Sequence, residues 1–315
     1  MKNVLITGGA GFIGFHTAIR FHSMGHKVKC IDNFNDVIYD QELKQARADK
    51  LEKEYGIEVF DVDICEKDDL KTHFEWHVPD LVIHLAAHAG VRTSMDKQYE
   101  YIQNNIAGTQ NLIDMMEAHD VNQVIYASTS CIMEGNPLPW GPDEKVGKML
   151  NPYGMSKLTN EHQFHISNIK SAVCLRFFTV YGPWGRPDMA LFQFTKNILE
   201  DKPITVFNNG DMKRDFTYVD DIVQGIELVS QHEFERETFC IGYGEQVDLM
   251  DFISHIEKNL GNKEAEKIYK PRHPADALET WSDITKLRDM VGYQPTTSIA
   301  DGVREFVSWY KEYYV

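Results

Sequence analysis

Three glycines near the start of the chain constrain its fold more than any other feature. A short apolar run leads into Gly8, Gly11 and Gly14, and Phe12 and Ile13 begin an apolar pattern with helical spacing. A strand, a glycine turn and a helix in this order let backbone N–H groups approach a pyrophosphate, and the helix N-terminus adds partial positive charge there. We therefore expect these five residues to bind a dinucleotide.

Apolar runs typical of strands alternate with helical patterns through the first half of the chain. The predicted strands cover residues 3–7, 27–31, 57–62, 80–85, 122–127 and 172–178. The predicted helices cover residues 12–25, 40–54, 66–76, 97–118 and 153–169. This alternation predicts an α/β fold with a Rossmann-type parallel sheet and helices on both of its faces.

The pattern changes near residue 180, where a turn-rich loop is followed by shorter elements. We expect a smaller, mainly C-terminal substrate lobe that packs against the sheet and leaves a ligand cleft between the two parts. The cofactor domain is predicted to comprise residues 1–179 and about 216–242. The substrate lobe is predicted to comprise about 180–215 and 243–315.

Composition excludes several classes of protein. The 315 residues include 32 Lys and Arg against 48 Asp and Glu, a net charge of −16 with no basic run, so nucleic acid and membrane surfaces are not expected partners. No apolar tract approaches the ~20 residues of a membrane-spanning helix. The five cysteines are widely spaced and form no C-x-x-C pair, so we expect buried thiols and no metal site. The glycine-rich start is unlike a signal peptide, and together with these cysteines it indicates a cytoplasmic protein.

Asp32 ends the second predicted strand, at the position where a carboxylate can accept hydrogen bonds from the ribose diol of an adenosine. The same carboxylate would repel a 2′-phosphate, so the expected cofactor is NAD and not NADP. The alternative is that Asp32 is only a turn residue before Asn33. Asp63 and Ile64 follow the third strand and are predicted to lie at the adenine edge, although an aspartate at a strand end is equally common as a plain loop residue.

Tyr153 and Lys157 are four residues apart and therefore share one face of a predicted helix. A tyrosine needs a neighbouring cation to act as a base near neutral pH, because its ordinary pKa is about 10. Such a pair often arises by chance on a surface, but the strand at 122–127 also runs into hydroxyl residues, among them Thr129. We expect Thr129 to bridge a substrate hydroxyl and the phenol. Alternatively these hydroxyls, Ser128 above all, only satisfy the strand end.

Further motifs carry a family resemblance over nearly the whole chain. They are the segments 84–87, 105–112 and 214–221, together with the glycine turn and the Tyr153/Lys157 pair. With them the chain resembles the extended short-chain dehydrogenases/reductases, in the nucleotide-sugar epimerase/dehydratase group. The segments 89–92, 176–190 and 212–217 are most similar to those of UDP-glucuronate 4-epimerases. The departures are Ile132-Met133-Glu134, where relatives commonly have Val-Tyr-Gly, and His88, where a glutamine is usual.

The resemblance implies roles for individual residues. Tyr153 would be the base, Lys157 its electrostatic partner and a ligand of the nicotinamide ribose, and Thr129 the bridging hydroxyl. Cofactor contacts are further implied for Asn33, Leu85, Ala86, Ala87 and Asn105. Substrate contacts are implied for Arg92, Thr129, Ser130, Thr179, Arg186, Arg214 and Arg272. Arg214 would bind the nucleotide diphosphate, whereas Arg272 is equally well explained as a solvated side chain, because its segment is offset from the family pattern.

The resemblance implies a homodimer as well, since relatives commonly dimerise through the helices that correspond to 97–118 and 153–169. Ile113, Met115 and Met116 can serve that contact or can be ordinary core residues.

The activity that the resemblance implies is NAD-dependent epimerisation at C4 of a UDP-sugar, foremost UDP-glucuronate to UDP-galacturonate through a 4-keto sugar. Such a ketone lies β to the C6 carboxylate and promotes loss of carbon dioxide, so we hypothesise that Thr129, Ser130 and Thr179 restrain that carboxylate. The alternatives are a neutral or N-acetylated sugar as substrate, a UDP-glucuronate decarboxylase, a 4,6-dehydratase and a non-catalytic NAD-binding protein. The dehydratase is disfavoured because Ser130-Cys131 stands where its Asp-Glu pair belongs.

Overall fold

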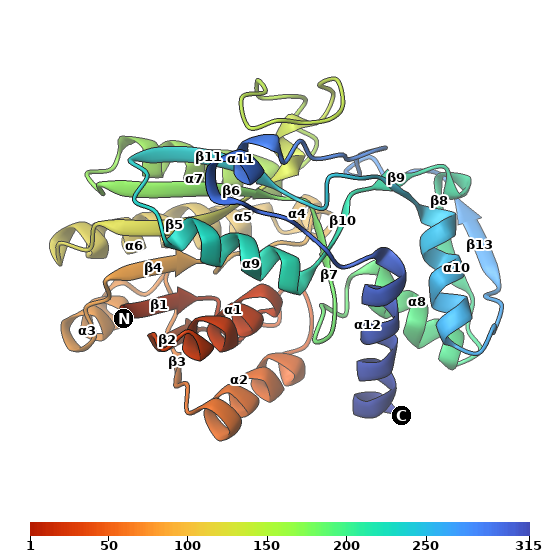
Figure 1. Cartoon of the computed structure of the whole chain (residues 1–315), viewed down its shortest axis with the longest axis horizontal. Helices are drawn as coiled ribbons and strands as arrows, with labels where there is room; N and C mark the ends of the chain where they lie inside the picture. The colour runs from red at the N-terminus through yellow and green to blue at the C-terminus, as the bar shows by residue number, and fades with distance from the viewer.

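The computed structural model describes residues 1–315 and is built around a seven-stranded parallel sheet in the order β11-β6-β5-β4-β1-β2-β3 (Figure 1). The strands are β1 (Asn3–Thr7), β2 (Lys27–Asp32), β3 (Val59–Asp61), β4 (Leu81–His84), β5 (Gln123–Thr129), β6 (Ser171–Phe177) and β11 (Arg236–Ile241). The strand order reverses between β1 and β4, which is where ligands bind to sheets of this kind, at the carboxyl ends of the strands. The predicted α/β fold is confirmed, and β11 is a strand that the sequence pattern did not reveal.

Two buried clusters cover the two faces of the sheet, because successive side chains of a strand point to opposite faces. Val4 and Ile6 of β1 belong to one cluster, and Leu5 between them belongs to the other. The first face is covered by α1 (Phe12–Ser23), α2 (Glu42–Tyr55), α9 (Val219–Ser230) and α11 (Thr285–Val291). The second is covered by α3 (Lys67–Trp76), α6 (Thr109–Ala118) and α7 (Pro152–Ile166).

The helix predicted over 97–118 is broken into three parts in the structure. After the single turn α4 (Thr93–Asp96) come α5 (Gln98–Tyr101), the π-helical segment η1 (Ile102–Gly108) and α6. The wider π-helical turn places both Asn104 and Asn105 in the interior. Helix α7 satisfies a backbone carbonyl group of this segment, because the Asn160 amide donates to the Asn105 carbonyl at 2.6 Å. The π segment is thus a local adjustment that buries two amides beside the predicted site.

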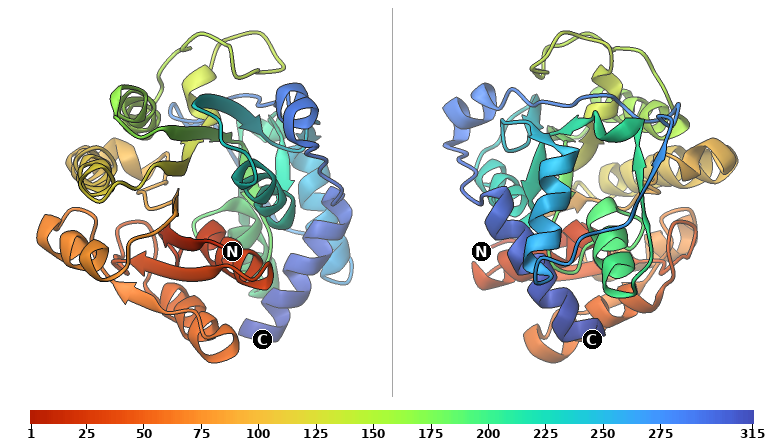
Figure 2. Two further views of the ribbon diagram at one scale, coloured as in Figure 1. Left: turned by 60° about the vertical axis from the view of Figure 1, so that its left-hand side comes forward. Right: turned by 90° about the vertical axis from the view of Figure 1, so that its right-hand side faces the viewer.

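The smaller part of the molecule is an α/β unit on the right of Figure 1, seen from its own side in the right-hand view of Figure 2. It contains α8 (Ala190–Leu199), β8 (Ile204–Phe207), η3 (Asn208–Gly210), β9 (Lys213–Arg214), β12 (Val247–Asp248), α10 (Leu249–Asn259), β13 (Lys267–Lys270) and α12 (Ile299–Tyr314). Strands β8 and β13 pair in parallel, and the short β9 and β12 pair antiparallel. A separate cluster of 18 buried residues forms its core.

Two short strands connect the parts, because β7 (Thr179–Tyr181) and β10 (Phe216–Tyr218) pair in parallel where the chain leaves and re-enters the sheet region. The C-terminal third does not stay in the lobe throughout: α11 packs against β11 and α9, and Leu287 belongs to the core of the sheet. The exact division between cofactor domain and lobe stays a prediction.

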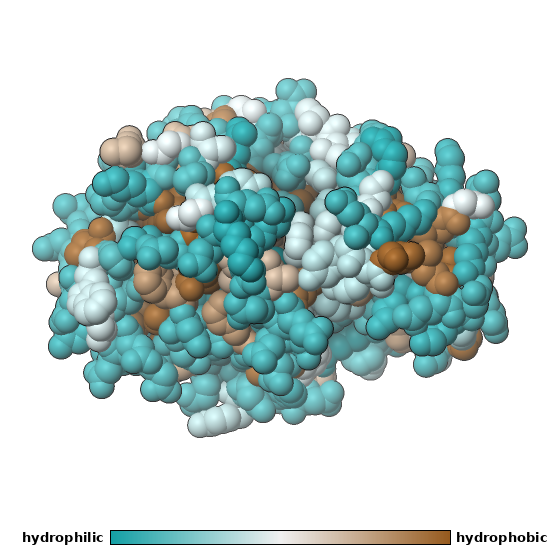
Figure 3. Space-filling view, turned by 90° about the horizontal axis from the view of Figure 1, so that it is seen from below, coloured by the Kyte–Doolittle hydropathy of each residue, from teal (hydrophilic) through white to brown (hydrophobic).

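Seen from below, the molecule is mostly hydrophilic, and apolar residues form separate patches among polar ones (Figure 3). No helix is long and apolar enough to cross a membrane. Ile113, Met115 and Met116 lie in the core beneath the second face, so the prediction that they contact another copy is wrong and their alternative role as core residues holds.

Candidate active site

A cavity of about 710 Å³ lies where the carboxyl ends of the central strands face the lobe, and most of the predicted site residues line it. From the cofactor set the lining residues are Gly8, Gly11, Phe12, Ile13, Gly14, Asp32, Asn33, Ile64, Leu85, Ala86 and Ala87. From the catalytic and substrate sets they are Arg92, Thr129, Ser130, Tyr153, Lys157, Thr179, Arg186 and Arg214. Asp63, Asn105 and Arg272 do not line it.

The glycine turn leaves no room for side chains. A Cβ on Gly14 would lie 2.1 Å from the Gly8 carbonyl oxygen, and one on Gly8, where φ is +72°, would lie 2.8 Å from the Ala86 nitrogen. No side chain caps α1 at Gly11, so the first N–H groups of that helix face the cavity without a protein acceptor. Free N–H groups at a helix N-terminus fit a pyrophosphate, and this end of the cavity therefore fits a dinucleotide.

Asp32 lies at the end of β2 and is almost fully buried. Its carboxylate accepts backbone N–H groups of Ala10 at 3.2 Å and Phe34 at 3.0 Å. Burial raises the pKa of Asp32, while Lys44 acts to lower it. A carboxylate in this position fits the diol of an adenosine ribose and disfavours a phosphate on it.

Asp63 is not among the residues that line the cavity, and its contact with adenine stays a prediction. Its carboxylate instead accepts the Asn33 amide at 2.9 Å and the Cys65 N–H at 2.8 Å, and these bonds close the turn after β3. The apolar neighbour Ile64 does line the cavity, as predicted. In the ligand-free structure Asp63 therefore positions Asn33.

Sequence reasoning missed a buried basic pair on α2. The Lys44 ammonium lines the cavity and donates to the Asn35 carbonyl, and the fully buried Arg47 donates to the Ala10 carbonyl at 3.0 Å and the Trp184 carbonyl at 2.6 Å. Arg47 thereby ties the glycine turn to the loop that carries Arg186. A signal was present, because Arg47 falls midway between Leu43 and Leu51 on the apolar face of that helix.

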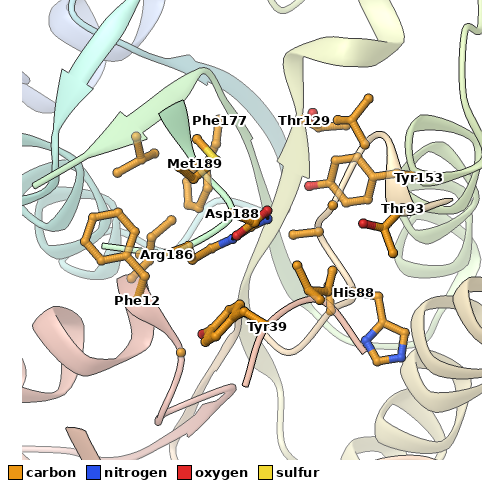
Figure 4. A pocket seen from close by; sticks show the side chains of 18 of the residues that line it. Phe12, Tyr39, His88, Thr93, Thr129, Tyr153, Phe177, Arg186, Asp188 and Met189 are labelled. Carbon is orange, nitrogen blue, oxygen red and sulfur yellow. Dashed lines mark hydrogen bonds and ion pairs between the residues drawn. The ribbon is translucent and has the colours of Figure 1, made fainter. Parts of the chain in front are cut away.

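Tyr153 and Lys157 are carried by the first two turns of α7. Asn151 caps this helix by accepting the Gly154 N–H at 2.8 Å, and Pro152 occupies its first turn. Burial lowers the pKa of Lys157 to about 8. Burial raises the pKa of Tyr153, and Arg186 and the Thr129 hydroxyl act to lower it. Figure 4 shows the Tyr153 hydroxyl pointing into the cavity beside Thr129.

The hydroxyl residues at the end of β5 have different surroundings. Thr129 and Ser130 line the cavity, and Thr129 Oγ1 also accepts the Cys131 N–H at 3.2 Å, which caps the 3-10 turn η2 (Ser130–Met133). Ser128 points the other way and donates to Glu161 at 2.5 Å. Ser128 thus has a structural role, which is the alternative that the sequence left open for these hydroxyl residues.

Asn105 does not line the cavity, and its cofactor contact stays a prediction. Its amide accepts the His88 N–H at 2.8 Å and donates to the His88 carbonyl at 3.0 Å and the Ser156 hydroxyl at 2.9 Å. These bonds hold the segment after β4, including Ala87, against α7. His88 lines the cavity with its pKa lowered by burial to about 4, so its ring is neutral near pH 7.

Three arginines line the cavity, each held by protein groups. Arg186 pairs with Asp188 at 2.6 Å and lies opposite Tyr153 in Figure 4. Arg92 pairs with Asp276 at 2.6 Å and stacks over the Phe207 ring at 4.1 Å. Arg214 donates to the carbonyl groups of Ala277 and Leu278.

Arg272 is exposed and donates to the Asp276 carbonyl at 3.1 Å, outside the cavity. Only the Ala277 and Leu278 carbonyl groups of this segment accept from Arg214, and the Arg272 side chain is left in solvent, as its solvated alternative describes. A substrate contact of Arg272 stays a prediction.

Known proteins resemble this chain over its full length. Residues 4–242 match the NAD dependent epimerase/dehydratase family. The UDP-glucuronate 4-epimerase of Thermodesulfobacterium geofontis is 39% identical over 99% of this chain and 97% of that protein. The crystal structure of UDP-glucuronic acid 4-epimerase from Bacillus cereus with UDP-glucuronic acid and NAD is 36% identical, covers 99% and 100% of the two chains and superposes with a TM-score of 0.92. The UDP-glucose 4-epimerase of Thermus thermophilus with NAD is 26% identical, covers 99% of both chains and has a TM-score of 0.88.

Proposed function

The chain belongs to the NAD dependent epimerase/dehydratase family, and from this premise we propose that it is an NAD-dependent 4-epimerase that converts UDP-glucuronate to UDP-galacturonate. The observation that carries the proposal is the meeting of Tyr153, Lys157 and Thr129 in one cavity with the glycine turn. A protein that only bound NAD would have no use for a buried phenol with a lysine one helical turn away.

The residues of the chain divide the chemistry among them. NAD, when bound, supplies the redox step by accepting a hydride from C4 and returning it to the other face of the ketone. Tyr153, as its phenolate, takes the proton of the 4-hydroxyl and later gives it back, and Thr129 orients that hydroxyl. Lys157 stabilises the phenolate by its charge, because burial raises the pKa of Tyr153 and opposes ionisation.

The proposed substrate contacts lie at the other end of the cavity. Arg214 and Arg92 face the nucleotide diphosphate in this arrangement, and guanidinium groups match phosphate oxygens geometrically. Arg186, which Asp188 holds in place, offers guanidinium N–H donors near the sugar. Ser130 and Thr179 offer hydroxyl groups on the same wall to hold the C6 carboxylate in the plane of the ketone.

We also propose a homodimer in which α5, η1 and α7 meet their counterparts. The support is a group of exposed apolar side chains on these neighbouring elements, Tyr99 at 69%, Ile102 at 41% and Met155 at 39% exposure. In the proposed contact these three residues take the place of Ile113, Met115 and Met116, which are buried.

A cytoplasmic location is part of the proposal and is supported by five free cysteines, three of them buried. The product would then be a precursor for polysaccharide biosynthesis.

A panel of sugar nucleotides tests the proposal. Purified protein is incubated with UDP-glucuronate, UDP-galacturonate, UDP-glucose, UDP-galactose and UDP-N-acetylglucosamine, and the configuration at C4 is followed by NMR. We expect interconversion of the two uronates, no reaction in the Tyr153→Phe variant, and NAD released when the protein is denatured. Turnover of neutral sugars alone would overturn the substrate assignment, and no turnover without bound NAD would overturn the enzyme assignment.

A further inference from the structure

A buried ion pair lies directly behind the catalytic elements and plays no part in the steps above. Glu161 and Arg176 are joined by two bonds, from Arg176 Nε to Oε1 at 3.0 Å and from Nη2 to Oε2 at 2.9 Å, with side chains only 12% and 9% exposed. Burying two charges costs more than their attraction returns unless the geometry is good, so such a pair is weak evidence of a stabilising role by itself. Its placement suggests another role.

Glu161 continues the spacing of the catalytic helix. Tyr153, Lys157 and Glu161 follow one another at intervals of four residues on α7, so all three share one face of the helix. The Glu161 carboxylate also accepts the Ser128 hydroxyl at 2.5 Å, and Ser128 directly precedes Thr129. The Glu161 side chain thus contacts the end of β5, which carries Thr129, and lies one helical turn from Lys157.

Arg176 extends the contact to the segment that precedes α7. Its Nη1 donates to the Pro142 carbonyl at 2.9 Å, and the Met133 sulfur lies 3.6 Å from the same nitrogen. The pair therefore connects β5, β6, α7 and the loop leading into Tyr153. These are the elements whose relative positions set the geometry of the site.

The charges around Lys157 leave Glu161 as its anion. Cys174 and Glu161 are the side chains that act to raise the pKa of Lys157 against burial. Burial raises the pKa of Cys174 well above its usual range, so that thiol is neutral. Burial also lowers the pKa of His84 to about 3, which leaves this ring neutral, and it opposes ionisation of Tyr153 in the ligand-free protein. Glu161, paired with Arg176, is then the charged side chain that acts to raise the pKa of Lys157.

We propose that Glu161 is a positioning residue of the proposed epimerase: its charge keeps Lys157 protonated, and its hydrogen bond to Ser128 fixes the end of β5 that carries Thr129. The effect of Glu161 on Lys157 applies to the ligand-free protein as well as to the reaction. The effect on Thr129 rests on the proposed function.

The test measures the titration of Lys157 and the pH profile of turnover in the same variants. Lysine labelled with ¹³C at Cε gives the midpoint of Lys157 by NMR, assigned with a Lys157→Met variant. In Glu161→Gln the loss of a nearby negative charge favours deprotonation, so we expect the midpoint to fall by about one pH unit or more. The alkaline limb of the kcat/KM profile should move to lower pH by a similar amount, because Lys157 loses its charge there and no longer stabilises the Tyr153 phenolate.

Conservative and remote variants separate charge from geometry. Glu161→Asp keeps the charge on a shorter side chain, so it should retain the wild-type midpoint while kcat falls several-fold from the lost Ser128 contact. Glu257→Gln removes a comparably buried acid, paired with Lys267 at 2.6 Å in the lobe, and should leave the midpoint of Lys157 unchanged.

If Glu161→Gln does not fold, the double variant Glu161→Gln/Arg176→Met removes the ion pair as a unit and should show a smaller shift in the same direction. An unchanged Lys157 midpoint in both variants, or a lower rate at an unmoved pH optimum, would overturn the proposal. A shifted midpoint in a protein that epimerises no UDP-sugar would instead overturn the proposed function and leave the role of Glu161 toward Lys157 standing.

Discussion

The two ends of the cavity hold their proposed ligands by different means. At the glycine turn the contacts are backbone N–H groups, and the controlling feature is the absence of side chains at Gly8 and Gly14. At the lobe end the contacts are the side chains of Arg92, Arg186 and Arg214, each held by a carboxylate or by carbonyl groups. The first end should therefore be sensitive to added volume, and the second to lost charge.

The same difference explains how a chain of charge −16 can bind two diphosphates. A helix N-terminus attracts an anion without any basic side chain, and only a few placed arginines are needed for the other ligand. The acidic residues that set the net charge describe the solvated exterior and not the cavity.

Adding one methyl group at the glycine turn should have the largest effect. In Gly14→Ala the Cβ would lie 2.1 Å from a backbone oxygen, so the turn must move. Strain of more than about 3 kcal/mol corresponds to more than about a hundredfold loss of NAD affinity, and activity should fall with it. NAD released per chain on denaturation measures the effect. Gly141→Ala is the matched control, because its Cβ would make an ordinary contact 3.8 Å from Asp283. A full complement of NAD in both variants would show that the glycine turn is not sensitive to added volume.

Removing a charge at the lobe end should weaken the nucleotide and spare the cofactor. Arg214→Leu removes the charge-assisted bonds proposed for the diphosphate, so the KM for UDP-glucuronate should rise about 10- to 100-fold, or about 1.5–3 kcal/mol. Calorimetric titration with UDP and the NAD content of the same sample separate the two sites. Loss of NAD in this variant would show that the two ends are not independent.

Removing a hydroxyl at the junction of the two ends should change the products. In Ser130→Ala the proposed restraint on the C6 carboxylate is weaker by about 1 kcal/mol, so the ratio of epimer to decarboxylated pentose should fall about fivefold. NMR of the sugar nucleotides after complete turnover gives this ratio. The same ratio in the variant and the wild type would remove Ser130 from the carboxylate site.

The smallest effect is expected at Arg272. Its side chain is exposed and outside the cavity, so Arg272→Ala should change UDP affinity less than about twofold and stability by less than about 0.5 kcal/mol. Titration with UDP and thermal unfolding check both values. A tenfold loss of affinity would show that residues 271–278 rearrange when the nucleotide binds.

Sequence patterns predicted most of the fold and failed at specific places. The first six strands were found because buried parallel strands are short apolar runs between helical patterns. The edge strand β11 was missed because its first half, Arg236–Thr238, is polar and only half-buried. The π segment was missed because α7 satisfies its Asn105 carbonyl group and the Asn105 amide, tertiary contacts that no local pattern records.

The predicted site residues divide in the same way, into those set by local sequence and those set by tertiary contacts. Residues whose role depends on local geometry were placed on the cavity wall, as with the glycine turn, Asp32 and the Tyr153/Lys157 pair. Asp63 and Asn105 do not line the cavity, because their side chains bond to neighbouring backbone and amide groups, and their cofactor contacts stay predictions. Lys44 and Arg47 escaped notice because charged residues on a helix are usually solvated.

The sequence by itself determined the parallel sheet, the cofactor turn and the spacing of the catalytic helix, since each depends on contacts within a few residues or on a repeating pattern. Only the tertiary structure decided which cations face the cavity, which hydroxyl turns inward, and that Glu161 meets both Ser128 and Arg176. Those contacts join residues far apart in the chain, and burial and charge act on them through space.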